Sequence, residues 1–291
     1  MINRQRARLI GLVVLMVVGG YLYYQFASPR VFEVKGRVAG FGTDRTTLIV
    51  SHEDIPGYMK AMTMPFTVRD TSELTSLHTG DPVGFTLHVT SKDAWITNIR
   101  PVPDSLIHVD GNDKTFEDVA AKGDGKQVQA GDLVPEVTLV NQDGKKVNTS
   151  DFRNKVLVIT FFYTSCPLPN YCPLMSGNFR EAENTLVEAY GQEVHLLSIS
   201  FDTQKDTPEV LKKYGQRYRA QFGYWSFASG TDEEIGKLTS AFGVFYQPQK
   251  GTFTHNLRTV VIGKDGRIRK IFPGNQWTPE DLVREVAAVV K

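Results

Sequence analysis

The sequence predicts two folded domains, a small all-β domain followed by an α/β domain, behind an N-terminal membrane-spanning helix. Three observations indicate this arrangement: residues 9–29 are apolar and uncharged, residues 31–102 contain five short strand-like runs, and residues 131–291 alternate strand-like with helix-like segments. The length of 291 residues also suggests two domains, at roughly 150 residues for each. The formal net charge of +1 gives no basic surplus, so nucleic acid is not expected as a partner.

The N-terminal segment has the length and charge pattern of a transmembrane helix. Residues 9–29 carry no charge, and Arg4, Arg6 and Arg8 precede them. A helix of this length reaches about 31 Å, close to the ~30 Å thickness of the hydrocarbon core of a membrane. Positive flanks stay in the cytoplasm, so we expect residues 1–8 there and both domains on the periplasmic, extracytoplasmic side of the inner membrane. A cleaved signal peptide is the alternative, but no Ala-x-Ala site follows the apolar core, which favours an uncleaved single-pass anchor.

The all-β domain is predicted from short apolar runs separated by turn signals. The five runs are residues 32–42, 46–52, 61–68, 83–90 and 94–102. Gly-Thr-Asp, Ile-Pro-Gly and Thr-Gly-Asp tripeptides stand between them, and such tripeptides favour tight turns. Five short strands in some seventy residues predict a small β-barrel.

A cluster of soft potential metal ligands lies within this domain. Residues 51–66 contain His52 together with Met59, Met62 and Met64, three of the six methionines of the chain. Side chains alternate along a strand, so Met62 and Met64 share a face, and a neighbouring antiparallel strand could bring His52 opposite them. A single methionine is more often a core filler. Thioethers beside an imidazole suit Cu(I) or Ag(I) better than Zn²⁺, Mg²⁺ or Ca²⁺, so the combination favours a metal site.

Several motifs of this domain match a known family. They are Gly36-x-Val38, Ser51-His52, Ile55-Pro56, Met62-Thr63-Met64-x-Phe66-x-Val68 and Gly80-Asp81-x-Val83. With them, residues 31–102 resemble the CusF-like periplasmic copper-binding domain. The resemblance implies a five-stranded, OB-like barrel that binds Cu(I) or Ag(I) through His52, Met62 and Met64. Family members with a metal-capping tryptophan place it three residues before the first of these methionines, where this chain has Met59, a candidate third thioether ligand.

A polar, glycine-rich stretch, residues 103–130, follows the barrel. Its composition predicts a linker. A linker of this length would let two domains on one anchor meet repeatedly and would raise their effective concentration toward each other.

The α/β domain contains the only two cysteines of the chain, Cys166 and Cys172. They follow the apolar run Val156–Phe162, which predicts a strand buried on both faces, and precede apolar residues at helical spacing. A helix N-terminus lowers the pKa of a nearby thiol and favours the thiolate, which attacks disulfides or binds metal. Further strands are expected over residues 194–201, 258–263 and 267–272, and helices are expected to start at Thr207-Pro208 and Thr278-Pro279. This order predicts a mixed sheet with helices on both faces.

The cysteine segment also belongs to a wider pattern. The pattern consists of Phe162-Tyr163-Thr164-x-Cys166-Pro167, Cys172-Pro173, Ser200-Phe201-Asp202, Asp206-Thr207-Pro208, and His255 shortly before Val260-Val261-Ile262. With it, residues 131–291 resemble the Sco/SenC family of thioredoxin-fold copper proteins. The resemblance implies a thioredoxin-like domain in which Cys166, Cys172 and His255 bind copper, as Cu(I) or Cu(II). Family members usually separate the two cysteines by three residues, whereas five intervene here.

Other interpretations of these residues stay open. Cys166 and Cys172 could form a structural disulfide, which is common outside the cytoplasm. Oxidation would abolish the metal site, so a copper role requires a thiol reductant as a partner, and redox activity of the two thiols is an alternative. Asp202 either orients the metal site from a second layer or caps a strand end. The remaining histidines show no partner pattern and are interpreted as ordinary polar residues: His78, His88, His108 and His195.

Three functions are compatible with these features. The first is a membrane-anchored copper chaperone, a metallochaperone rather than an enzyme, that delivers copper to an extracytoplasmic acceptor such as a cytochrome oxidase copper centre in a terminal oxidase subunit. The second is a thiol-disulfide oxidoreductase that keeps the acceptor's cysteines reduced. The third is a copper or silver resistance protein that sequesters metal.

Overall fold

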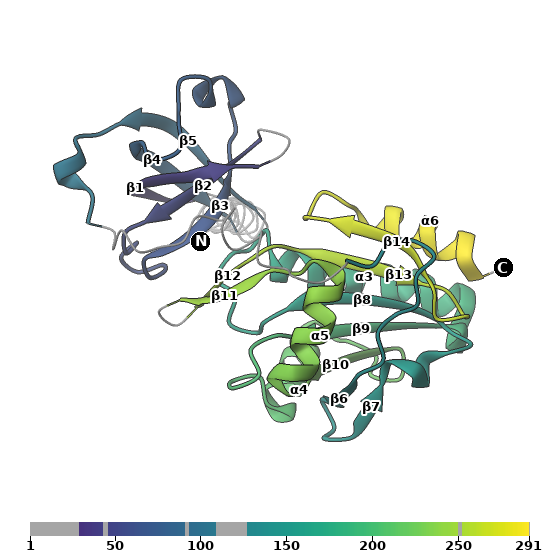
Figure 1. Ribbon diagram of the computed structural model, residues 1–291. Helices are drawn as coiled ribbons and strands as arrows, with labels where there is room; N and C mark the ends of the chain where they lie inside the picture. Colours follow the sequence, from purple (N-terminus) through teal and green to yellow (C-terminus); the bar gives the residue numbers. More distant parts are fainter. Residues whose placement is uncertain (1–28, 43–45, 91–92, 109–126, 250–251, 291) are drawn as a thin grey trace, which may run out of the picture.

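The computed structural model describes residues 29–42, 46–90, 93–108, 127–249 and 252–290 (Figure 1). The predicted anchor, residues 9–29, lies outside these residues apart from Pro29 and stays a prediction. No helix in the described part of the chain is both long enough and apolar enough to cross a membrane.

The N-terminal domain is a five-stranded barrel. Its strands are β1 (Arg30–Phe41), β2 (Thr47–His52), β3 (Met62–Thr67), β4 (Pro82–Val89) and β5 (Ala94–Pro101). The strand order is β3-β2-β1-β4-β5, with antiparallel neighbours throughout. A parallel bridge between Val68 and Ile96 joins the two edges of this sheet and closes the barrel. The five short strands predicted for this domain are confirmed as one five-stranded all-β sheet, and its strand order is that of an OB fold.

Strand β1 pairs with both β2 and β4, and a bulge lets it bend between them. Its register against β2 shifts between Val38 and Gly40, and such a bulge increases local bending and twist. Buried side chains alternate along the strand and include Val34 and Val38, so one face of β1 packs into the barrel core.

The C-terminal domain is built on a seven-stranded mixed sheet. Its strands are β6 (Thr138–Asn141), β7 (Lys146–Asn148), β8 (Val156–Phe162), β9 (Val194–Ser200), β10 (Trp225–Ser229), β13 (Arg258–Ile262) and β14 (Ile268–Pro273). The order is β14-β13-β8-β9-β10-β6-β7, and β8, β9 and β10 are parallel. Every residue of these three central strands is buried, as expected for strands covered on both faces.

Within the described residues, four α-helices cover the sheet, and a hairpin lies beside it. The helices are α3 (Cys172–Tyr190), α4 (Pro208–Arg217), α5 (Asp232–Phe242) and α6 (Pro279–Val290), and the hairpin is formed by β11 (Tyr246–Gln249) and β12 (Thr252–His255). Helices α3 and α6 pack together behind the sheet in Figure 1, and α5 crosses in front of it. Thr207 caps α4 by accepting a hydrogen bond from the Val210 amide, and Pro208 occupies the first helical turn.

The two domains touch. Strand β3 of the barrel lies beside β12 of the C-terminal domain (Figure 1). The Thr254 hydroxyl on β12 donates a hydrogen bond to the Thr63 carbonyl oxygen on β3.

Candidate metal centres

Cys166, Cys172 and His255 come together in the folded C-terminal domain. Cys166 lies in the loop after β8, Cys172 is the first residue of α3, and His255 ends β12. Their donor atoms all lie within 4.8 Å of one another, and Cys172 Sγ is 3.7 Å from His255 Nε2 across 83 positions of sequence. Both thiols are free, Cys172 and His255 are buried, and Cys166 is half-buried. Three soft donors therefore converge on one enclosed point.

The His255 ring is oriented toward the sulfur atoms. Its Nδ1 lies 2.8 Å from the Asn256 carbonyl oxygen. A carbonyl oxygen only accepts, so Nδ1 carries the proton and the lone pair of Nε2 faces the thiols. Metal-binding histidines are usually fixed by such a bond from the second ring nitrogen. The rings of Tyr163, Tyr171 and Phe201 surround the imidazole at centroid distances of 5.5, 5.5 and 5.1 Å.

The two thiols have different acidities. Burial raises the pKa of Cys172 well above its ordinary value, and the neighbouring Cys166 raises it further. Burial also opposes ionisation of Cys166, but interactions with Cys172 and His255 outweigh it and hold the Cys166 pKa well below its ordinary value. The sequence suggested that the helix N-terminus would lower the thiol pKa. At Cys172, the residue that starts α3, desolvation prevails instead.

Asp206 holds the cysteine loop in place, a role that sequence reasoning missed. Its buried carboxylate accepts hydrogen bonds from the Thr164 amide at 2.9 Å, the Thr164 hydroxyl at 2.5 Å and the Ser200 hydroxyl at 2.5 Å. Burial raises the pKa of Asp206, while the bonds from Ser200 and Thr164 favour the carboxylate. The bonds tie the end of β9 to the turn two residues before Cys166. The Asp-Thr-Pro motif was visible in the sequence, but its partners were not.

Asp202 lies beside the cluster without contributing to it. Its carboxylate is buried, and one oxygen accepts a hydrogen bond from the Lys205 amide at 3.2 Å. The other oxygen has no hydrogen-bond partner among the described residues. Asp202 lines a cavity of about 600 Å³ together with Phe201, whose ring contacts His255. A second-layer role for Asp202 stays a prediction.

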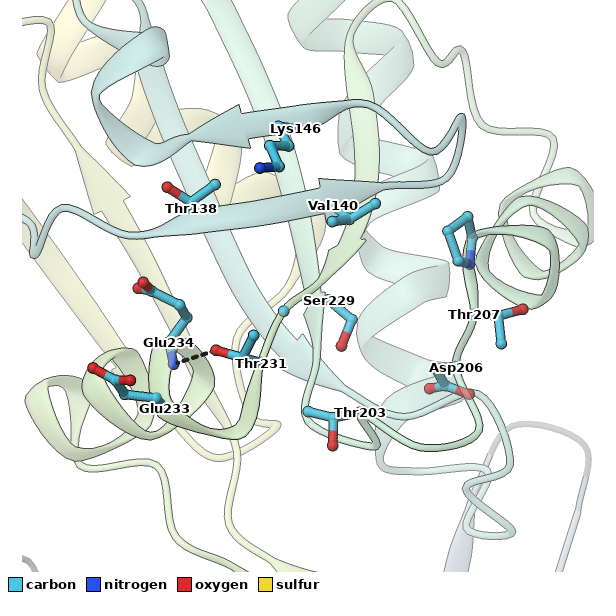
Figure 2. Close-up of a pocket in the computed structure, with 12 residues that line it drawn as sticks. Thr138, Val140, Lys146, Thr203, Asp206, Thr207, Ser229, Thr231, Glu233 and Glu234 are labelled. Carbon is cyan, nitrogen blue, oxygen red and sulfur yellow. Dashed lines mark hydrogen bonds between the residues drawn. The ribbon is translucent and has the colours of Figure 1, made fainter.

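A second cavity, of about 650 Å³, lies apart from the three donors. Figure 2 shows its lining, which includes Thr203, Asp206, Ser229 and Glu234 but none of the clustered cysteine and histidine residues. The candidate metal centre is thus an enclosed point between a loop, a helix start and a hairpin.

The barrel gathers a second set of soft donors. His52 pairs in register with Met62, and Met64 lies two residues farther along the same face of β3. Met62 and Met64 are each 3% exposed. Met59 is 8% exposed in the same core and closes the turn begun by Ile55 through two backbone hydrogen bonds.

His52 has a free ring nitrogen in an apolar environment. The side chain is fully buried, and Nδ1 lies 2.6 Å from the Glu53 carbonyl oxygen, so Nδ1 carries the proton. Nε2 has no hydrogen-bond partner among the described residues. Burial lowers the pKa of His52 to about 4, so the imidazole is neutral near pH 7. A buried lone pair without a partner is costly, and a metal ion would satisfy it.

Gly36 allows β1 to approach β2 at His52. Gly36 and His52 lie directly opposite each other on the two paired strands. A Cβ atom at Gly36 would lie 2.4 Å from the Ser51 carbonyl oxygen and 2.9 Å from His52 Cα. Only glycine fits this approach, which explains its place in the motif.

Two family models match this chain. A family model described as SCO1/SenC matches residues 125–291, more than half of the chain. The chain belongs to the SCO1/SenC family. A second model, described as the copper binding periplasmic protein CusF, matches residues 31–101. This SCO1/SenC protein therefore carries a CusF-like N-terminal domain, and both predicted resemblances are confirmed.

Individual relatives match about half of the chain. The SCO1 protein homolog of Bacillus subtilis is 29% identical over 158 residues, which are 53% of this chain and 80% of that protein. A putative copper-binding protein of Stutzerimonas stutzeri is 27% identical over 141 residues, covering 47% of this chain and 67% of its own.

Solved structures give the same match. A SCO1/SenC family lipoprotein from Bacillus anthracis has a TM-score of 0.50 at 28% identity and covers 56% of this chain and 96% of its own. The structure of BsSco, in which a disulfide switch was identified, has a TM-score of 0.50 at 26% identity. It covers 57% of this chain and 99% of its own, and BsSco is a member of the Sco family of cytochrome c oxidase assembly proteins. The C-terminal domain thus has the Sco variant of the thioredoxin-like fold.

Proposed function

We propose that this protein is a copper chaperone that binds copper at Cys166, Cys172 and His255 and delivers it to an extracytoplasmic acceptor such as the copper centre of a cytochrome oxidase. The observation that carries the proposal is the convergence of two thiols and an imidazole within 4.8 Å in an enclosed site. Thiolate sulfur and imidazole nitrogen form a donor set suited to copper, and the two thiolates stabilise Cu(I). Copper is the cargo of such a protein.

The CusF-like barrel supplies a second proposed copper site, formed by His52, Met62 and Met64, with Met59 as an additional thioether. The buried Nε2 of His52 supports it, because no hydrogen-bond donor among the described residues meets this lone pair and burying an unpaired polar atom is costly. Thioethers select Cu(I), and Ag(I) shares this preference.

The proposed location is the periplasmic side of the inner membrane, with residues 9–29 as the anchor. The matched CusF model is periplasmic by its description, which supports a location outside the cytoplasm. Because thiols oxidise there, the proposal includes a reductant that restores Cys166 and Cys172. Alkaline phosphatase fused after Lys291 should be active in cells, whereas activity of a cytoplasmic reporter alone at that position would contradict this topology.

A thiol-disulfide oxidoreductase is the second candidate function. The lowered pKa of Cys166 favours it, because the thiolate is the attacking species. Cys166 would attack a disulfide of the acceptor and form a mixed disulfide. Cys172 would then displace the acceptor as its dithiol, which leaves a Cys166–Cys172 disulfide that an external dithiol must reduce.

The copper stoichiometry of the full chain tests the first proposal. Reduced protein titrated against a Cu(I) chelator should bind two equivalents, one per domain. Protein with oxidised cysteines, or with Cys166→Ser and Cys172→Ser, should bind one, since a disulfide sulfur is a poor metal donor. The double variant Met62→Leu with Met64→Leu, whose changes are nearly isosteric, should lose the copper equivalent bound by the barrel. Unchanged stoichiometry in these variants would refute both sites.

A further inference from the structure

The loop between the two cysteines is docked on the barrel. The inter-cysteine loop, residues 167–171, accepts a hydrogen bond at the Pro167 carbonyl oxygen from the Tyr58 hydroxyl at 3.2 Å. Asn170 Nδ2 donates to the Ala94 carbonyl oxygen at 3.1 Å. Leu168 is 5% exposed and packs within the barrel core. A polar bond on each side of a buried leucine makes this a specific contact.

The inter-cysteine loop is also fixed from its own domain. The Tyr171 amide donates to the Leu168 carbonyl oxygen at 3.1 Å, which closes a turn that projects the leucine. Asn275 Nδ2 donates to the Asn170 carbonyl oxygen at 2.7 Å. The loop therefore acts as a shaped projection of the SCO1/SenC domain.

Part of the docked surface of the barrel lies beside the methionines. Tyr58 directly precedes Met59, and the hydrogen-bonded Thr63 carbonyl lies between Met62 and Met64 on β3. In the C-terminal domain, the hydroxyl that donates this hydrogen bond belongs to Thr254, the residue before His255 on β12. Cys166 and Tyr171 pack against the cores of both domains. Strand β3, which carries Met62 and Met64, and strand β12, which ends at His255, thus meet at this interface.

We propose that Cu(I) passes within the chain from His52, Met62 and Met64 to Cys166, Cys172 and His255, and that the inter-cysteine loop holds the two sites together for this transfer. The inference rests on the proposed copper binding at both sites. Domains already in contact have a high effective concentration, so no collision between protein molecules is needed.

The donor chemistry sets the direction. Thioethers are neutral, whereas each thiolate adds a negative charge that attracts the cation in an enclosed, low-dielectric site. The bonds from copper to two thioether sulfurs and one imidazole break, and bonds to two thiolate sulfurs and the second imidazole form. The two thiols release their protons to solvent. Copper remains Cu(I), so no oxidant or reductant enters the transfer itself.

A transfer experiment with the full chain tests this proposal. The disulfide form is loaded with one Cu(I), which only the barrel can hold, and excess phosphine then reduces Cys166 and Cys172. The rate at which phosphine converts the disulfide to free thiols is measured separately, by alkylation of metal-free protein. Copper-thiolate absorption in the ultraviolet should then appear at a rate that does not change over a tenfold range of protein concentration. At equilibrium the cysteine site should hold at least ten times more copper than the barrel.

Variants of the inter-cysteine loop separate docking from binding. Leu168→Asp places a carboxylate in the apolar barrel core and should slow transfer at least tenfold, with a rate that now rises with protein concentration. Leu133→Asp makes the same change at a leucine that is 51% exposed in the same domain and should leave transfer unchanged. Tyr58→Phe with Asn170→Ala removes both hydrogen bonds without adding charge and should slow transfer by a smaller factor.

Two results would overturn the proposal in distinguishable ways. If single-site variants each bind Cu(I) but the wild-type rate is proportional to protein concentration, transfer occurs between molecules and the intrachain route is wrong. If the disulfide form binds no Cu(I) at all, the barrel site itself fails, and with it that part of the proposed function.

Discussion

Three buried histidines use their rings in different ways. His195 Nε2 bonds the Ser226 hydroxyl at 2.9 Å, and its ring lies against Phe152. The second nitrogens of His52 and His255 instead face an apolar core and a thiol. The Met-x-Met pair identified His52 from the sequence, and the family pattern identified His255. The burial of His195 was not predictable, because its partner comes from a strand 31 positions away.

His195 should make the stability of the protein depend on pH. Burial, and then the nearby charge of Lys155, lower its pKa to about 4, whereas an unfolded histidine titrates near pH 6.5. The unfolded chain therefore binds the proton first as pH falls. This contribution to stability is complete above pH 6.5 and is lost as pH falls toward 4, by about 3 kcal/mol. Denaturant unfolding of metal-free protein across this range should show a steeper loss for wild type than for His195→Gln. Parallel curves would contradict the assignment.

Gly36→Ala should weaken the barrel copper site. The new Cβ would collide with the Ser51 carbonyl and the His52 backbone and push β2 away from β1. We expect the Cu(I) affinity of the barrel to fall at least tenfold in a chelator competition.

Gly40→Ala is the matched control for Gly36→Ala, since it lies on the same strand and its Cβ would meet only Ile49 Cδ1 at 3.7 Å. Equal affinities for the two variants would show that the close approach at His52 is not needed.

At the scale of elements, hydrophobic pattern predicted most of the strands and helices. The predicted runs 46–52 and 94–102 correspond to β2 and β5, and the strand over 156–162 is β8. The β11–β12 hairpin, which carries His255, was not predicted. Its two strands have only four residues each and are largely polar, and packing against aromatic side chains such as Phe201 holds the hairpin in place. Such tertiary contacts leave no local signal in a single sequence.

Asp206→Ala should loosen the turn that leads into Cys166. The change leaves the Thr164 amide and the Ser200 hydroxyl without their buried acceptor, which costs about 1–3 kcal/mol for each group. We expect a lower unfolding free energy and faster alkylation of Cys166.

Asp206→Asn keeps one oxygen acceptor and should recover part of both effects of Asp206→Ala. An alkylation rate equal to that of wild type in Asp206→Ala would mean that the carboxylate does not position the loop.

At the scale of the whole molecule, the sequence indicated two copper-related domains but not their contact. The composition of residues 103–130 predicts a linker that lets the two domains meet. In the structure the Val128 amide bonds the Ala241 carbonyl oxygen, so the end of this stretch is part of the C-terminal domain. The domain interface includes Leu168 and Asn170, which the sequence showed only as an unusually long spacing between the cysteines.

The central claim is that His255 and the two thiols form a copper site. The Cu(I) affinity of the reduced full chain, compared between wild type and His255→Ala, tests it most directly. Thiol-disulfide exchange is measured on the same two proteins. In His255→Ala the barrel should keep its copper, the second equivalent should bind at least tenfold more weakly, and the cysteines should still form a disulfide. His195→Gln should match wild type. If His255→Ala retains full affinity for both equivalents but no longer reduces an acceptor disulfide, His255 serves thiol chemistry and the copper assignment is wrong.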